Sequence, residues 1–97
     1  MSVPANRPPQ AVERVQTGVR IEKRLLKVMK AVAEMRDLTL GDLIEGVMLH
    51  AFEGKQPFSA ETLAKVKELK HVYGLELDAA AAHGLREAKP EKKERRP

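Results

Sequence analysis

The 97-residue sequence contains no cysteine and no tryptophan, and its only aromatic residues are two phenylalanines and one tyrosine. Without cysteine the chain can form neither disulfide bonds nor thiolate metal sites. The scarcity of aromatic rings argues against the stacking platforms that bind single-stranded nucleic acid. No apolar run approaches the roughly 18 residues that a membrane span requires. We therefore expect no membrane partner.

Motifs for catalysis or cofactor binding are also missing. None of the three histidines, His50, His71 and His83, belongs to a spaced metal-binding motif. There is no glycine-rich phosphate loop, and the carboxylates show no spacing that requires acid–base chemistry. We expect no enzyme activity, no catalytic residue, no metal and no cofactor. The first ten residues lack the apolar stretch of a secretory signal, which favours a cytoplasmic protein.

What the sequence does contain is a segregation of charge. Residues 1–36 carry eight basic and three acidic side chains, whereas residues 37–85 carry four basic and eight acidic ones. Residues 86–97 are basic again, with six basic and three acidic side chains. Positive charge concentrated at one end of a chain is typical of nucleic-acid binding, although a basic helix is often only a solvated surface.

Residues 15–21 alternate between two kinds of side chain. Val15, Thr17, Val19 and Ile21 fall on one side of an extended chain, and the residues between them on the other. A period of two is the pattern of a half-buried β-strand. The face that carries Val19 and Ile21 is expected to point into the core.

The pattern then changes to one of helices. Apolar residues recur every three or four positions in two stretches, which predicts helices over residues 23–36 and 40–53. Thr39 is a good N-cap for the second helix, with Asp42 three residues on as an acidic variant of the capping box. Gly54 and Pro57 end this helix. The predicted order is strand, helix, tight turn, helix.

A single strand has no partner for its backbone hydrogen bonds, and two short helices make too small a core alone. Both difficulties are resolved if two chains pair their strands antiparallel about a two-fold axis. The expected dimer core comprises Val19, Ile21, Leu25, Met29, Leu43, Ile44 and Val47. In this respect residues 15–52 resemble the ribbon-helix-helix DNA-binding proteins of the Arc and MetJ type, which read the major groove with a two-stranded ribbon.

The resemblance implies a mainly α fold with one short N-terminal strand, an intertwined homodimer and binding to double-stranded DNA. The outward strand positions, Gln16, Gly18 and Arg20, would face the bases. Gln can pair with adenine and Arg with guanine, while Gly18 permits close approach. The resemblance places DNA phosphates at Thr39, Leu40 and Gly41, where a helix start exposes its amides, and the nearby Lys23 and Arg24 are further phosphate candidates. The implied function is a transcriptional repressor.

The remainder of the chain lies outside this resemblance. Ser59 is a candidate N-cap for a helix with an apolar face through Tyr73, Gly74 ends it, and Asp78 precedes a short alanine-rich turn that Gly84 ends. The predicted organisation is a flexible arm over residues 1–14, the ribbon-helix-helix domain over 15–53, a helical extension over 54–85, and a charged disordered tail over 86–97.

Three alternatives remain open at this point. Residues 58–85 could instead bind a partner protein, as in an antitoxin whose DNA binding is autoregulatory. A helix-turn-helix formed by residues 23–36 and 39–52 could contact DNA, although it would leave the alternation over residues 15–21 unexplained. A purely structural dimer would bind no DNA. Arg7 and Arg14 in the arm could touch a phosphate or merely keep a loose tail soluble.

Overall fold

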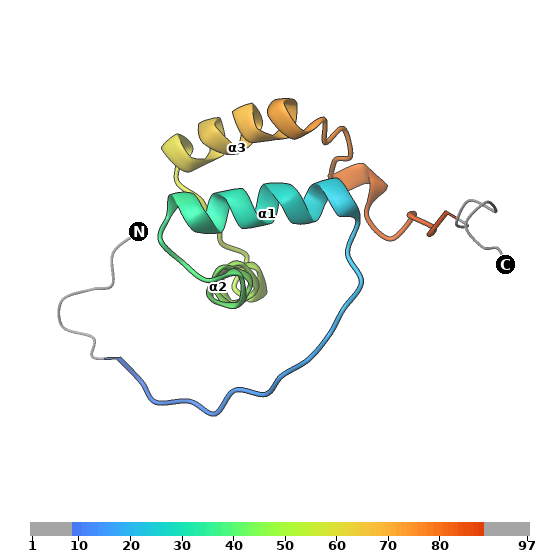
Figure 1. The fold of residues 1–97 in the computed structure, drawn as a ribbon. Helices are drawn as coiled ribbons and strands as arrows, with labels where there is room; N and C mark the ends of the chain where they lie inside the picture. The colour runs from blue at the N-terminus through green and yellow to red at the C-terminus, as the bar shows by residue number, and fades with distance from the viewer. Residues whose placement is uncertain (1–8, 89–97) are drawn as a thin grey trace, which may run out of the picture.

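The structure, a computed structural model, describes residues 9–88. Within them it contains three α-helices, α1 (Lys23–Met35), α2 (Leu40–Phe52) and α3 (Ala60–Tyr73), and one turn of 3₁₀ helix, η1 (Ala79–Ala81) (Figure 1). Helix α1 packs against both of the others. The predicted helices are confirmed to within one residue at their C-terminal ends. Residues 1–8, which include Arg7, and residues 89–97 of the predicted tail lie outside the described part of the chain.

Side chains cap the start of each α-helix. The Thr39 Oγ1 accepts a hydrogen bond from the Asp42 amide at 3.0 Å, and the Ser59 Oγ accepts one from the Thr62 amide at 3.1 Å. Both caps were predicted from the sequence. Helix α1 begins differently, because the carboxylate of Glu22 accepts a 2.7 Å hydrogen bond from the Leu25 amide. Each cap satisfies an amide that the helix itself leaves unpaired.

Each of the three α-helices is followed, within two residues of its end, by a residue in the left-handed conformation. Gly54 and Gly74 both have φ near 70°, which confirms the two predicted glycine stops. The third is Asp37, with φ of 58°, where the sequence pattern indicated only a break. The amide that follows Asp37, that of Leu38, donates to the Ala33 carbonyl at 2.8 Å. Such closing hydrogen bonds are those of the Schellman motif.

The hydrophobic core of the single chain is small and centred on α1. Around the buried residues lies a shell of half-buried apolar side chains, among them Val66 and Leu69 from α3. A second link joins α1 to α3, since Arg36 Nη1 donates to the buried Thr62 Oγ1 at 2.8 Å. The extension therefore packs on α1 rather than standing apart. The buried hydrophobic residues are Val28, Val32, Ala33, Leu43 and Leu75.

The strand predicted over residues 15–21 is not formed in the single chain. No strand occurs anywhere in residues 9–88, and the segment before α1 runs as a long arc without regular structure (Figure 1). Val19, expected to point into the core, is 72% exposed, and Ile21 is only half-buried. The physical reason is the one that the sequence raises: a strand needs a second strand for its backbone hydrogen bonds.

Candidate nucleic-acid interface

The three residues expected to face DNA bases, Gln16, Gly18 and Arg20, are all exposed. Arg20 is paired with Glu87 near the C-terminus: its Nε donates to Oε1 at 3.0 Å, and its Nη2 donates to Oε2. The hydrogen bond and the charge of Glu87 raise the pKa of Arg20, and the same contact lowers the pKa of Glu87. The guanidinium edge that would meet guanine is thus occupied by a carboxylate.

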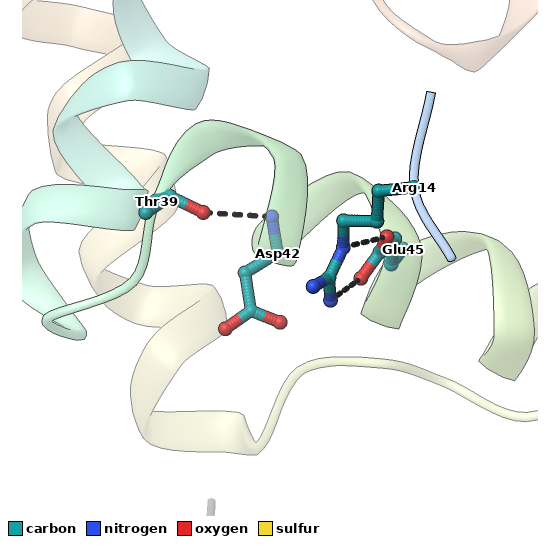
Figure 2. A network of polar contacts seen from close by, with 4 residues as sticks. All are labelled: Arg14, Thr39, Asp42 and Glu45. Carbon is teal, nitrogen blue, oxygen red and sulfur yellow. Dashed lines mark hydrogen bonds and ion pairs between the residues drawn. The ribbon is translucent and has the colours of Figure 1, made fainter. Parts of the chain in front are cut away.

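Arg14 is paired in the same way with a carboxylate on α2. Its Nε and Nη2 each donate to an oxygen of Glu45 at 2.8 Å, and Figure 2 shows the two planar groups facing one another. The hydrogen bond from Arg14 lowers the pKa of Glu45. Both side chains are largely exposed, so the pair contributes little stability. It does place the arm beside α2.

The start of α2 offers the amides that the resemblance assigns to a phosphate. Thr39 and Gly41 are exposed and Leu40 is half-buried. As residues of the first turn, Leu40 and Gly41 have amides with no acceptor inside the helix. The Asp42 carboxylate points away from Thr39 in Figure 2, so it does not complete a capping box and leaves a negative charge beside this site.

The two basic residues expected to contact phosphate differ in their surroundings. Lys23 is exposed at the start of α1, next to the extended segment. Arg24 instead reaches across to the end of α3, where its Nη1 donates to the Gly74 carbonyl at 3.2 Å. A cation at a helix C-terminus is favoured by the exposed carbonyls there. Arg24 therefore already has a structural role in the single chain.

The residues predicted to form the dimer core are only partly covered. Of the seven, Leu43 alone is buried; Ile21, Met29, Ile44 and Val47 are half-buried, and Val19 and Leu25 are exposed. Residues of a core that two chains share would remain partly exposed in a single chain. Leu43 is thus a core residue of the single chain, whereas the shared dimer core stays a prediction. Four of the other residues, Leu25, Met29, Ile44 and Val47, line an open surface.

That surface is an apolar groove with a volume of about 520 Å³. Its floor is α1, with Val28 and Val32, and one wall is α2, with Val47. The other wall comes from the chain after α3, with Leu77 and Leu85. The sequence pattern did not predict this second wall, because its residues are separated by polar and small ones. The recurrence of leucine at 75, 77 and 85 was the available signal.

Two kinds of feature are absent from the described residues. They hold no group of three or more histidine, aspartate or glutamate side chains able to bind a metal, and no helix among them is long and apolar enough to cross a membrane. What they offer is exposed amide and guanidinium groups on an extended segment, beside a capped helix start. Comparisons with protein-family models, with curated proteins and with solved structures found no match for this chain.

Proposed function

We propose that this chain is a ribbon-helix-helix protein: a homodimer that binds specific sequences of double-stranded DNA and represses transcription. In the dimer, residues 15–21 of two copies pair as an antiparallel ribbon in the major groove. Gln16 and Arg20 contact bases, with Gly18 between them. Lys23 and the start of α2, at Thr39, Leu40 and Gly41, contact the DNA backbone. Arg24 also contacts the DNA backbone if its side chain releases the Gly74 carbonyl at the end of α3.

The observation that carries this proposal is the apolar character of α2. Its 13 residues include only Asp42, Glu45 and His50 as charged or ionisable side chains, yet Leu43 is its only buried residue. Leu49 is 65% exposed and Phe52 is 76% exposed. A helix that is apolar nearly all round belongs in a core. A second copy of the same helix would supply that core.

The extended segment supports the same arrangement independently. Val15 and Val19 are both exposed there, and in a strand they would face away from Gln16 and Arg20. Apolar residues that alternate with polar ones favour a strand with one covered face, and the single chain contains no strand to pair with it in residues 9–88. Two-fold pairing would satisfy the backbone and bring two copies of Gln16 and Arg20 to one surface.

The packing of α3 helps to distinguish this proposal from the antitoxin alternative. An arm that orders only on binding a partner should make few contacts in the free chain. Instead Val66 and Leu69 pack on the core, and Leu75 is buried. This favours an extension that belongs to the folded domain, and DNA binding as the primary role.

The proposal is tested by selecting bound sequences from a random pool of duplexes with the wild type and Arg20→Ala side by side. The wild type should enrich a two-fold-symmetric motif that contains guanine, and the variant should lose the guanine preference and bind its best site at least about tenfold more weakly. Arg14→Ala is the matched control, because it removes an arm arginine outside the ribbon. Failure of the wild type to enrich any motif would contradict the proposal.

The salt dependence of the affinity provides a second test of the proposed complex. If each dimer makes roughly six to ten phosphate contacts, its affinity should fall by about 10³–10⁵ between 50 and 200 mM salt. Lys23→Ala should weaken all sequences alike and make that dependence shallower, without changing the enriched motif. A motif that changes in the Lys23 variant would show that this residue reads bases instead.

A further inference from the structure

The second wall of the groove, formed by residues 75–85, has no counterpart in the strand–helix–helix unit that the proposed function uses. Its Leu75 is buried against the core, whereas Leu77 and Leu85 line the groove and Leu85 is still 53% exposed. Ala82, also exposed, lines the same wall. Leu75 and Leu77 thus pack on the core, whereas Leu85 and Ala82 present apolar side chains to the open groove.

An apolar face of matching character lies next to the groove. Met48 both lines the groove and is exposed, and Leu49 and Phe52 continue the apolar surface of α2 from it. Because Met48 belongs to both features, a two-fold axis near this residue would bring each copy's α2 toward the other copy's groove. The groove and the face would then be covered together, and neither is covered by the described part of a single chain.

We infer that the occupant of the groove is a second copy of this chain, and that residues 75–85 clasp the partner copy's α2 through its apolar face of Met48, Leu49 and Phe52. The inference rests on the proposed dimer but goes beyond it. It makes the C-terminal extension part of the subunit interface, so that dimerisation requires residues 75–85 as well as the ribbon and α2.

Chemical cross-linking tests this contact directly, because the chain has no cysteine of its own. Two single-cysteine proteins, Leu85→Cys and Phe52→Cys, are mixed, allowed to exchange subunits, and treated with a short thiol-to-thiol cross-linker. The expected product is a covalent pair that contains one copy of each, identified by mass spectrometry. Val72→Cys replaces Leu85→Cys in the control, since Val72 is 71% exposed on α3 and does not line the groove.

Weakened association is the second readout. Leu85→Asp and Ala82→Arg place a charge on the wall at exposed positions, so the single chain should keep its helices, as circular dichroism would verify. Each should weaken dimerisation by more than about tenfold in analytical ultracentrifugation, since apolar contact area is lost and a charge is buried. Val72→Asp should leave the dimerisation constant unchanged.

The outcomes separate this inference from the proposed function. If the wild type is dimeric but Leu85→Cys and Phe52→Cys give no cross-linked pair, the clasp is overturned and the ribbon-helix-helix dimer still stands. The same holds if Ala82→Arg dimerises as strongly as the wild type. A wild type that is monomeric overturns both.

Discussion

At the scale of single residues, Arg14 and Arg20 are held by carboxylates far away in the sequence. Arg20 meets Glu87, 67 residues on, and Arg14 meets Glu45, 31 residues on. Exposed ion pairs of this kind are weak and screened by salt, so a DNA phosphate or base can displace them. In the proposed complex, the pairing with Glu87 would therefore compete with DNA at Arg20.

Replacing that competitor should strengthen DNA binding. Glu87→Gln removes the charge that faces Arg20, and affinity for the selected site should rise, by less than about fivefold because the pair is exposed. Glu76→Gln is the matched control, since it changes the net charge equally on another exposed side chain. Fluorescence anisotropy with labelled duplex measures both. Equal effects of the two substitutions would mean that Glu87 acts only through overall charge.

Gly74 should tolerate alanine less well than Gly54 does. Both have φ of 70°, so each substitution costs about 1 kcal/mol of backbone strain. At Gly54 an added Cβ meets open space, but at Gly74 it would lie 2.9 Å from Arg24 Nη1. Gly74→Ala should therefore cost up to about 1 kcal/mol more, through the displaced hydrogen bond. Urea denaturation measures the difference, which should vanish when Arg24 is also replaced by alanine.

At the scale of elements, the helices follow from short-range signals and the contacts between them do not. Thr39, Ser59, Gly54 and Gly74 could be recognised because a cap or stop depends on residues within about six positions. Glu22 was harder, because glutamate is an uncommon N-cap. The contact from Arg24 to Gly74 spans 50 residues, and no local pattern encodes such a distance.

The cap on α1 makes the stability of that helix depend on pH. Hydrogen bonds from the amides of Leu25 and Arg24 lower the pKa of Glu22 below its ordinary value of 4.5. A carboxylate with a lower pKa in the folded state stabilises that state fully above the unfolded pKa. That contribution is lost as the pH falls through the folded pKa.

Glu22→Gln isolates this contribution, because glutamine can still accept a hydrogen bond but does not titrate. Between pH 6 and a pH well below 4.5, the free energy of unfolding should decrease more for the wild type than for the variant. Thermal or urea unfolding at a series of pH values measures both curves. Parallel curves would show that Glu22 has the same pKa in the folded and unfolded chain, and hence that the cap does not hold the carboxylate.

At the scale of the whole molecule, the single chain leaves too much apolar surface uncovered. Among residues 9–88, the core has only five buried hydrophobic residues, and no side chain is completely buried. The sequence alone indicated a shared core because the strand lacked a partner, and the structure adds the uncovered α2 and the groove. The sequence did not show that the C-terminal segment lines this groove, since that depends on how α3 packs.

The free energy of unfolding should therefore depend on protein concentration, as it does for a dimer whose core is shared. The urea midpoint of the wild type should rise as the protein is concentrated. Phe52→Asp should remove this dependence, because Phe52 belongs to the proposed interface. Val72→Asp should preserve it, although both residues are similarly exposed in the single chain. If Phe52→Asp behaves like Val72→Asp, α2 is not at the interface.

The most direct test of the account is whether residues 15–21 of two copies pair with each other. In a dimer mixed from isotope-labelled and unlabelled chains, filtered nuclear Overhauser spectra detect only contacts between copies. We predict contacts between the backbone protons of residues 15–21 in one copy and those of the same segment in the other, in an antiparallel pattern about a two-fold axis. A dimer whose segment 15–21 shows no contact with its counterpart would contradict the ribbon, and with it the proposed mode of reading DNA.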